Sequence, residues 1–501
     1  MFPFAVPGKK VEEVLVTDDP VRNLNDIEEE LEALRAAEGE DIFSLYYEHA
    51  DVDVAAHEKK RRDTLLAPEV GAACEAVLAG DYDAPLKRRA KVVSNWVTLA
   101  RAETDEIIEL AEEVQKIVIN VKPTLDGEEI PRHRKTNILF KEADRDVRRR
   151  AFQSEGKLRE ELLERAPRLY RLRNDAAQAL GYEDYPSLAL EGEALTVAEL
   201  KGLIDKYERA TRQPYEELMA EGVGRFQLDK VEPWDVHYVT DRLCAADDKY
   251  FPEEAALPSL ADVVKGFGRD LDGLGIDLRA DADIPYGGLC FGIRIPDDVR
   301  ILINLKDGMS DLRVLYHEFG HAVHRKFTAA PNFSLKAGDA GFFAEAMADT
   351  WGLLVDRPAW LRRFTKMSED EIAGVADAAE KAFAARIRRF MTTQSFEIDA
   401  YRNADGDMAA TLDDYAERFL GYRYDDDGMW AEQYFPLLYP MYSKNYMLAR
   451  IIQRAVHDYL ESEYGEPLGE PKAFDFLVER FYADGALHTW KEKLAAVGLE
   501  L

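Results

Sequence analysis

Apolar positions recur along most of this chain at the three- and four-residue steps of amphipathic helices. From about Asp26 to Gln115, charged and apolar residues follow this spacing, and turn signals such as GDYDAP separate the runs. The helical pattern resumes at Glu142 and includes RAPRLYRLRNDAAQALGY, where Gly181 is expected to end a helix. The pattern therefore predicts a mainly α protein.

Two stretches break the helical spacing with the period-two alternation of strands. INVKPTLDGEEIPRHRKTNILF contains Asp126-Gly127, a strong signal for a tight hairpin turn. In PYGGLCFGIRIPDDVRILINL we expect a strand, a turn at Pro296 to Asp298, and a second strand. A small sheet is therefore predicted directly before the helix that follows.

That helix carries LYHEFGHAVH, in which His317, Glu318 and His321 have HExxH spacing. Histidines four positions apart project from one helix face, so both imidazoles can bind one metal ion while Glu318 borders its open coordination position. Ser310 is expected to be the N-cap of this helix. Four apolar residues mark its buried face: Leu312, Leu315, Phe319 and Phe327.

A third ligand is available on the next predicted helix, DAGFFAEAMADTWGLL, which begins near Asp339. Glu345 lies 24 residues beyond His321 and can complete a site of two histidines and one glutamate. Asp349, one turn further, is placed to accept the free ring N–H of a ligating histidine. We expect one Zn²⁺ per chain, although cobalt or manganese can bind the same ligands.

These motifs resemble zinc peptidases whose third ligand is a glutamate. ILFKEADRDVRRRAF, the PWDVHYV segment around Asp235, and HEFGHAVH together resemble the thimet oligopeptidase and oligoendopeptidase F family. NFSLKAGDAGFFAEAMADTWGLL is also similar to angiotensin-converting-enzyme-like peptidases. HExxH with Glu345 and Asp349 is the sharp part of this resemblance, and the other segments are looser.

The resemblance implies a two-lobed helical zincin peptidase with a deep central channel, the zinc on the channel floor, and short unstructured peptides as substrates. Zinc held by His317, His321 and Glu345 would polarise a water and the scissile carbonyl. Glu318 would take the proton of the water and deliver it to the leaving amine. The implied activity is that of a zinc-dependent oligoendopeptidase.

The family also places tyrosine hydroxyls opposite the zinc helix, where they stabilise the charge that grows on the carbonyl oxygen. In YFPLLYPMYSKNYMLARII the resemblance favours Tyr442 and Tyr446 for this role, with Tyr439 as a weaker candidate. Relatives often carry a histidine roughly ten residues before the stabilising tyrosine, whereas DDDGMWAEQYF contains none. A histidine-assisted step is therefore in doubt.

In relatives, an edge strand before the zinc helix pairs with the substrate backbone. The corresponding strand here supplies four expected substrate-binding residues: Gly288, Leu289, Cys290 and Phe291. Tyr439 is a fifth, from the tyrosine segment. Gly287, Gly288 and Gly292 would let another backbone come close, and backbone pairing would tolerate many peptide sequences. The alternative is an ordinary hairpin whose glycines mark a bulge or bend.

The 501 residues are 47% hydrophobic, and no Pro/Gly/Ser-rich linker or repeat divides them. We expect a single peptidase unit over residues 1–501. Within it, residues 1–115 would form an N-terminal helical wall of the channel, residues 116–255 the hairpin and further channel helices, and residues 256–501 the catalytic zinc-binding region.

Several features favour a cytoplasmic protein. No run approaches the roughly 18 apolar residues needed to span a bilayer, and MFPFAVPGKKVEEV lacks the features of a secretion leader. The odd number and wide spacing of the cysteines predict neither a disulfide framework nor a cysteine metal site. The cysteines are Cys74, Cys244 and Cys290.

The net charge of −32, from 97 acidic and 65 basic residues, excludes nucleic acid and anionic membranes as natural partners. The acidic excess is spread along the chain, as in halophilic proteins of high-salt cytoplasm, and we expect a halophilic archaeal source. The alternative is a mesophilic enzyme whose field attracts cationic peptides. Neither the charge nor the order of residues along the chain predicts the oligomeric state.

Two other functions compete with the oligopeptidase. A carboxypeptidase or dipeptidyl carboxypeptidase would need a cation for the substrate carboxylate, and Arg450 and Lys444 are the candidates. A non-catalytic zinc-containing peptide-binding or scaffold protein is the alternative of another class, against which the intact Glu318 argues. His324 and His237 are expected mainly to pack rather than to act.

Overall fold

Helices make up nearly all of the regular structure of the computed structural model, which describes residues 18–466 and 468–501. The stretch MFPFAVPGKKVEEV, with the start of the predicted 1–115 wall, lies outside the described residues. The first helices are α1 (Pro20–Tyr47), α2 (Val54–Leu66), α3 (Pro68–Ala79), α4 (Ala84–Ala102) and α5 (Asp105–Asn120). The next group is α6 (Arg132–Lys141), α7 (Arg145–Phe152), α8 (Gly156–Leu162), α9 (Arg165–Ala179), α10 (Tyr185–Glu191), α11 (Val197–Phe226), α12 (Val236–Cys244) and α13 (Glu253–Gly266).

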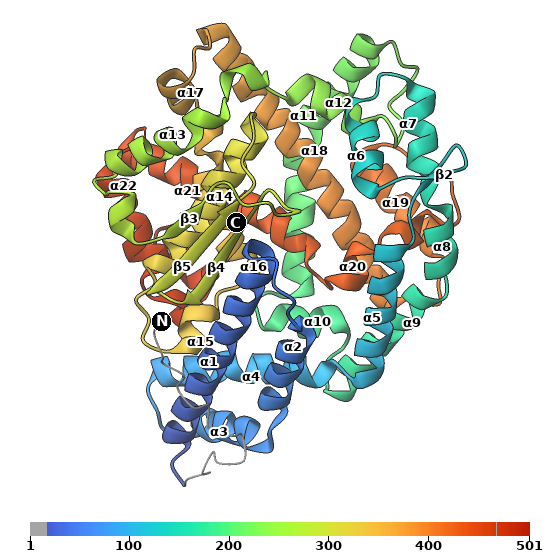
Figure 1. The fold of residues 1–501 in the computed structure, drawn as a ribbon. Helices are drawn as coiled ribbons and strands as arrows, with labels where there is room; N and C mark the ends of the chain where they lie inside the picture. Colours follow the sequence, from blue (N-terminus) through green and yellow to red (C-terminus); the bar gives the residue numbers. More distant parts are fainter. Residues whose placement is uncertain (1–17, 467) are drawn as a thin grey trace.

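The second half of the chain adds the helices that surround the HExxH motif. They are α14 (Met309–Lys326), α15 (Phe333–Ala337), α16 (Gly341–Gly352), α17 (Pro358–Phe364), α18 (Glu369–Arg402), α19 (Met408–Leu420), α20 (Phe435–Leu438), α21 (Ser443–Tyr464), α22 (Pro471–Leu477) and α23 (Trp490–Ala495). In Figure 1 a sheet and α13, α14 and α22 lie on one side, α5 to α9 lie on the other, and the long helices α11 and α18 run between them. The predicted mainly α, two-lobed architecture is confirmed.

The three-stranded sheet lies against the HExxH helix, as predicted. It has the order β3 (Asp277–Arg279), β5 (Asp298–Ile303), β4 (Gly288–Arg294), so β4 is an edge strand. β4 pairs with β5 in antiparallel register, whereas β3 pairs with β5 in parallel. The expected turn between the two longer strands is therefore confirmed, and both strands contact α14.

The Asp126-Gly127 hairpin is also confirmed, but its strands are short. β1 (Thr124–Leu125) and β2 (Glu128–Glu129) flank the turn, in which both central residues have positive φ. The expectation that alternation continues through RHRKTNILF is wrong, because this stretch forms α6. Only Leu139 of α6 is buried, so its apolar spacing is too sparse to distinguish a helix from a strand.

The two upstream segments of the family resemblance bind each other. Asp235, which is fully buried, pairs with Arg145 Nη2 and Arg148 Nη2 at 2.7 Å each. A buried carboxylate needs such partners, because an unpaired charge inside a protein is costly. These ion pairs join α7 to the start of α12, so the two segments have a structural role.

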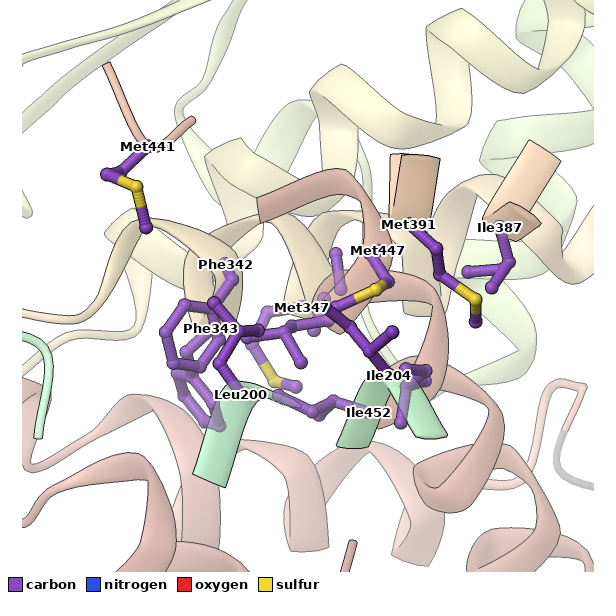
Figure 2. Packing of buried hydrophobic residues seen from close by; sticks show 14 of the residues in the cluster. Leu200, Ile204, Phe342, Phe343, Met347, Ile387, Met391, Met441, Met447 and Ile452 are labelled. Atoms are coloured by element: carbon purple, nitrogen blue, oxygen red, sulfur yellow. The ribbon is translucent and has the colours of Figure 1, made fainter. Parts of the chain in front are cut away.

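The centre of the core lies around α16. Figure 2 shows side chains of α16 packed among residues of α11, α18 and α21, while Met441 lies apart from the other labelled residues. Phe342, Phe343 and Met347 are fully buried there. Burial of most of its surface fixes α16 relative to the HExxH helix.

Among the described residues, no helix is both long enough and apolar enough to cross a bilayer. The three cysteines are free thiols.

Candidate metal centre and active site

His317, His321 and Glu345 converge where α14 crosses α16. Their candidate ligand atoms all lie within 4.8 Å of one another. Glu345 Oε2 is 3.5 Å from His317 Nε2, and Glu345 Oε1 is 3.8 Å from His321 Nε2. The two imidazole rings are nearly perpendicular, at 87°. Two imidazoles and a carboxylate at these separations suit a tetrahedral metal ion with one position left for water.

Glycines allow the two helices to approach this closely. A Cβ at Gly320, inside the HEFGH motif, would lie 2.7 Å from the carbonyl oxygen of Ala348, and one at Gly352 would lie 3.1 Å from His317 Cβ. Without these side chains, the α16 backbone lies directly against α14, which brings Glu345 to the histidines. The helix-packing contact and the metal group thus lie on the same two helices, α14 and α16.

The predicted N-cap of the HExxH helix is wrong by two positions. The N-cap is Gly308, with φ of 121°, and Ser310 lies in the first helical turn. No side chain caps this end, so the cap signal of serine was misread. Helix α16 begins at Gly341, close to Asp339 as expected, and Asp339 pairs with Lys493 Nζ at 2.9 Å.

Asp349 lies behind His317, as its spacing predicts. Its Oδ1 is 2.9 Å from His317 Nδ1, and its Oδ2 is 3.1 Å from Arg450 Nε. Burial alone would raise the pKa of Asp349, but Arg450 and His317 outweigh it and lower that pKa. An ionised Asp349 holds the His317 ring so that Nε2 faces the metal position.

The charges of the group fit a cation. Burial disfavours charged His317, yet Asp349 and Glu345 raise the pKa of His317 to about 10. Burial and the neighbouring charge of His317 lower the pKa of His321 well below its usual value. Asp349 and Glu345 thus stabilise positive charge at His317, while His321 is neutral. A divalent metal ion would supply that positive charge and bind the neutral imidazole.

Glu318 points from α14 toward the edge strand. A Cβ at Gly288 would lie 2.7 Å from Glu318 Cγ and 2.9 Å from a methyl group of Val314. The space that a side chain at Gly288 would occupy is therefore filled by Glu318 and Val314 of α14 and by Ile303 of β5. Burial raises the pKa of Glu318, which suits a group that accepts and returns a proton.

Tyr442 contacts the metal group directly. Its hydroxyl lies 3.4 Å from Glu345 Oε1, and burial raises its pKa. Tyr446 stacks on Phe390, with ring centroids 5.2 Å apart, and it is 37% exposed. Tyr439 is 53% exposed, on the wall of the adjoining cavity. The three predicted tyrosines thus form one wall but stand at different depths.

A cavity of about 1500 Å³ adjoins the metal group. Its walls include His321 and three of the predicted substrate-binding residues, Cys290, Phe291 and Tyr439, and it extends along α1, α2, α4 and α5. Leu289 instead packs toward Phe43 of α1. The carbonyl of Cys290 accepts a hydrogen bond from Arg325 Nη1 at 2.9 Å, so part of the edge strand already has a partner.

His324 and His237 have partners outside the metal group. His324 lies against Asp339 at 3.4 Å, and His237 stacks on Phe140 with centroids 4.6 Å apart. Burial lowers the pKa of both rings, which disfavours their charged forms. Their geometry is that of core side chains.

Two arginines near the site were missed. Arg325 lies one turn beyond His321 and lines the cavity, and that spacing was a readable signal. Arg386 on α18 is exposed and lies among the charges of Arg450, Asp349 and Arg313. Within the described part of the chain, Arg386 makes no hydrogen bond or ion pair. Nothing in the sequence distinguishes it from the other arginines of its helix.

Comparison with known proteins agrees with this geometry. Residues 276–449 match the family model of Peptidase family M3. Oligopeptidase A of Escherichia coli (strain K12) is 33% identical in an alignment 129 positions long, which covers 23% of this chain and 18% of that protein. The chain thus matches less than a fifth of that relative's length.

Solved structures resemble nearly the whole chain in fold. The M32 carboxypeptidase from Deinococcus radiodurans R1 has a TM-score of 0.66 and 15% identity, with 96% of both chains covered. A protein assigned to oligoendopeptidase F has a TM-score of 0.66 and 16% identity, with 96% of this chain and 88% of the other covered. The resemblance to the thimet oligopeptidase and oligoendopeptidase F group is confirmed, and the match to peptidase family M3 covers the region that carries the HExxH helix, the edge strand and the tyrosines.

Proposed function

We propose that this chain is a zinc-dependent oligopeptidase that hydrolyses internal bonds of short, unstructured peptides. The observation that carries the proposal is the convergence of His317, His321 and Glu345 beside Glu318, with the Tyr442 hydroxyl 3.4 Å from Glu345. A structural metal site needs neither a free carboxylate nor a hydroxyl at its open side. The match of residues 276–449 to peptidase family M3 supports the same reaction class.

The side chains divide the reaction among them. Zinc held by His317, His321 and Glu345 would supply the Lewis acid that activates water and polarises the carbonyl. Glu318 accepts the proton of the attacking water and returns it to the amine that leaves. Tyr442 donates its hydroxyl proton in a hydrogen bond to the oxygen on which negative charge develops. No covalent intermediate with the protein is required.

The cavity supports a preference for short peptides. Its walls come from both lobes, and its volume of about 1500 Å³ suits a short extended peptide better than a folded domain. Eight acidic and seven basic residues line it, although the whole chain has a large acidic excess. The near balance of charges predicts that peptides of either sign enter, which disfavours selection of cationic substrates alone.

A carboxypeptidase is the second candidate function, and Arg386 is the observation that favours it. Neither cation expected from the sequence is free: Arg450 pairs with Asp349, and the buried Lys444 pairs with Glu193 at 2.7 Å. Arg386 is exposed and unpaired among the described residues, so it is available for the carboxylate of a peptide.

Peptides of graded length with free or amidated C-termini separate the two functions. An oligoendopeptidase cleaves both forms at internal bonds, and Arg386→Ala changes kcat/KM by less than about threefold, as for a rim charge. A carboxypeptidase cleaves only the free form, and Arg386→Ala lowers kcat/KM by about 10²-fold because a charge-assisted contact is lost. Arg389→Ala on the same helix is the matched control. Product masses that show loss of C-terminal residues only would overturn the endopeptidase proposal.

The assays need a range of salt, because the charge distribution favours a halophilic, cytoplasmic enzyme. Repulsion among the excess carboxylates weakens as ionic strength rises. We therefore expect higher stability and activity in molar salt than in dilute buffer. Equal stability in both would favour a mesophilic enzyme.

A further inference from the structure

The backbone that carries Tyr442 is irregular. Between α20 and α21 the chain turns through Met441, whose φ of 56° lies in the left-handed region that residues other than glycine rarely adopt. Tyr442 follows directly, and α21 begins at Ser443. The direction of the Tyr442 side chain therefore depends on a backbone conformation that its own sequence does not favour.

Three buried side chains from other helices hold this segment by its backbone. Arg173 Nη2 of α9 donates to the carbonyl of Leu437 at 2.8 Å. On α18, Glu397 Oε1 accepts from the Met441 N–H at 2.5 Å, and Gln394 Oε1 accepts from the Lys444 N–H at 2.8 Å. Glu397 and Gln394 are both fully buried. One helix thus fixes the backbone on both sides of Tyr442.

Burial of the Glu397 carboxyl group costs free energy, which a purely structural side chain at this position would avoid. It is a carboxyl group without an ion pair to any described residue, and its other oxygen has only a long contact of 3.4 Å with Gln394. Burial raises the pKa of Glu397 to about 8, although the Met441 N–H, Arg173 and Lys444 oppose the shift. An apolar side chain at this place would avoid the burial of a polar group but would leave the Met441 N–H without an acceptor.

We infer that Glu397, together with Gln394, is a positioning residue that aims the Tyr442 hydroxyl at the metal group by holding Met441 in its left-handed conformation. This inference rests on the proposed peptidase function, in which Tyr442 stabilises the developing oxyanion. Glu397 contacts neither substrate nor metal and acts only through the backbone. Loss of its acceptor should therefore lower kcat and leave KM nearly unchanged, because Tyr442 acts in the transition state.

A double-mutant cycle between Glu397 and Tyr442 tests the inference. Glu397→Leu should lower kcat by about tenfold with KM within about twofold, whereas Glu397→Gln, which keeps an oxygen for the Met441 N–H, should restore most of kcat. In the Tyr442→Phe background, Glu397→Leu should have almost no further effect, because residues that act as one unit are not additive. Bound zinc and Tm are measured for every variant.

Asp413 offers a matched control on α19. It is also buried and accepts a backbone N–H, that of Tyr424, at 2.7 Å. Asp413→Leu should lower Tm as Glu397→Leu does but leave kcat within about twofold. If Glu397→Leu does not fold, Gln394→Leu replaces it in the cycle, because Gln394 fixes the other side of Tyr442.

The outcomes separate the inference from the proposed function. The inference is supported if the wild type is active, Glu397→Leu lowers kcat about tenfold, and Glu397→Gln restores most of it. The effect of Glu397→Leu must also be non-additive with that of Tyr442→Phe. Active wild type with unchanged kcat in the folded Glu397→Leu variant, or with fully additive effects, overturns it alone. Zinc-loaded wild type that cleaves no peptide overturns both the proposed function and this inference.

Discussion

The two walls of the candidate active site are built in different ways. On the metal wall, regular helices carry all the functional groups, and these helices approach closely at Gly320 of α14 and Gly352 of α16. On the tyrosine wall, an irregular segment carries Tyr442, and distant residues of α9 and α18 hold its backbone. The metal wall depends on local spacing and helix packing, whereas the tyrosine wall depends on a few long-range hydrogen bonds.

This difference has a consequence for robustness. Disruption of the helix contact in the metal wall should affect stability, metal binding and turnover together, because this contact supports all three. Damage to the tyrosine wall should affect turnover with the metal still bound. Variants that separate these properties therefore test whether the two walls are independent.

The largest effect is expected from Gly320→Ala. The new Cβ would lie 2.7 Å from the Ala348 carbonyl oxygen, so α16 must move away from α14. We expect a loss of about 3 kcal/mol in the free energy of unfolding and a fall in turnover of about 10²-fold as the ligands separate. Urea denaturation, metal content and peptide hydrolysis measure the three quantities.

Gly374→Ala is the control for this prediction. Gly374 lies in α18, and a Cβ there meets nothing within 4 Å. The same substitution should raise stability by about 0.5 to 1 kcal/mol through helix propensity. Equal effects at both positions would contradict the packing argument.

Tyr442→Phe should lower kcat by about 10²-fold with the metal retained, because one donor to the oxyanion is lost. Tyr446→Phe should lower it by less than about threefold, since Tyr446 stacks on Phe390 and no hydrogen bond of its hydroxyl is found among the described residues. Steady-state kinetics with one short peptide compare the two variants. The reverse order would assign the oxyanion role to Tyr446.

Asp349→Asn should weaken zinc binding by about tenfold, because the amide supports the His317 ring less well than a carboxylate does. Arg450 also loses its partner, so some of the effect will appear as lower stability. Competition with a chelator measures the zinc affinity. An unchanged affinity would mean that Asp349 serves only to pair Arg450.

The last prediction concerns pH and the tyrosine wall. The pKa of Glu397 is about 8 in the folded protein, above its value of about 4.3 in an unfolded chain. Between these values the folded state binds more protons, so stability should fall as pH rises through this range, by at most about 1.4 kcal/mol per unit. Glu397→Gln should flatten this part of the profile. Urea titrations at several pH values measure it, and identical slopes in both proteins would contradict the shift.

The sequence predicted those parts of the site that follow local rules. HExxH spacing, the i to i+4 relation of Glu345 and Asp349, and the hairpin signals all appear in the structure where expected. These features depend on residues a few positions apart, so helix and strand periodicity suffices to place them.

The remaining features depend on tertiary packing. Gly288 accommodates the Glu318 side chain, a fact that only the approach of α14 to β4 reveals. Glu397 and Arg386 belong to a long helix with no local motif, and their importance follows from what α18 faces. The misread N-cap at Ser310 and the helix over RHRKTNILFK show the same limit, since weak local signals yield to packing.

Glu318→Gln tests the central claim most directly. Wild type and variant are loaded with zinc, their metal content is determined, and hydrolysis of quenched-fluorescent peptides of graded length is followed in molar salt. We predict that the variant keeps its zinc and loses turnover by about 10³-fold or more, because the amide cannot accept the proton of the water. A zinc-loaded wild type that binds peptides but cleaves none, or a variant that turns over at the wild-type rate, would contradict the account.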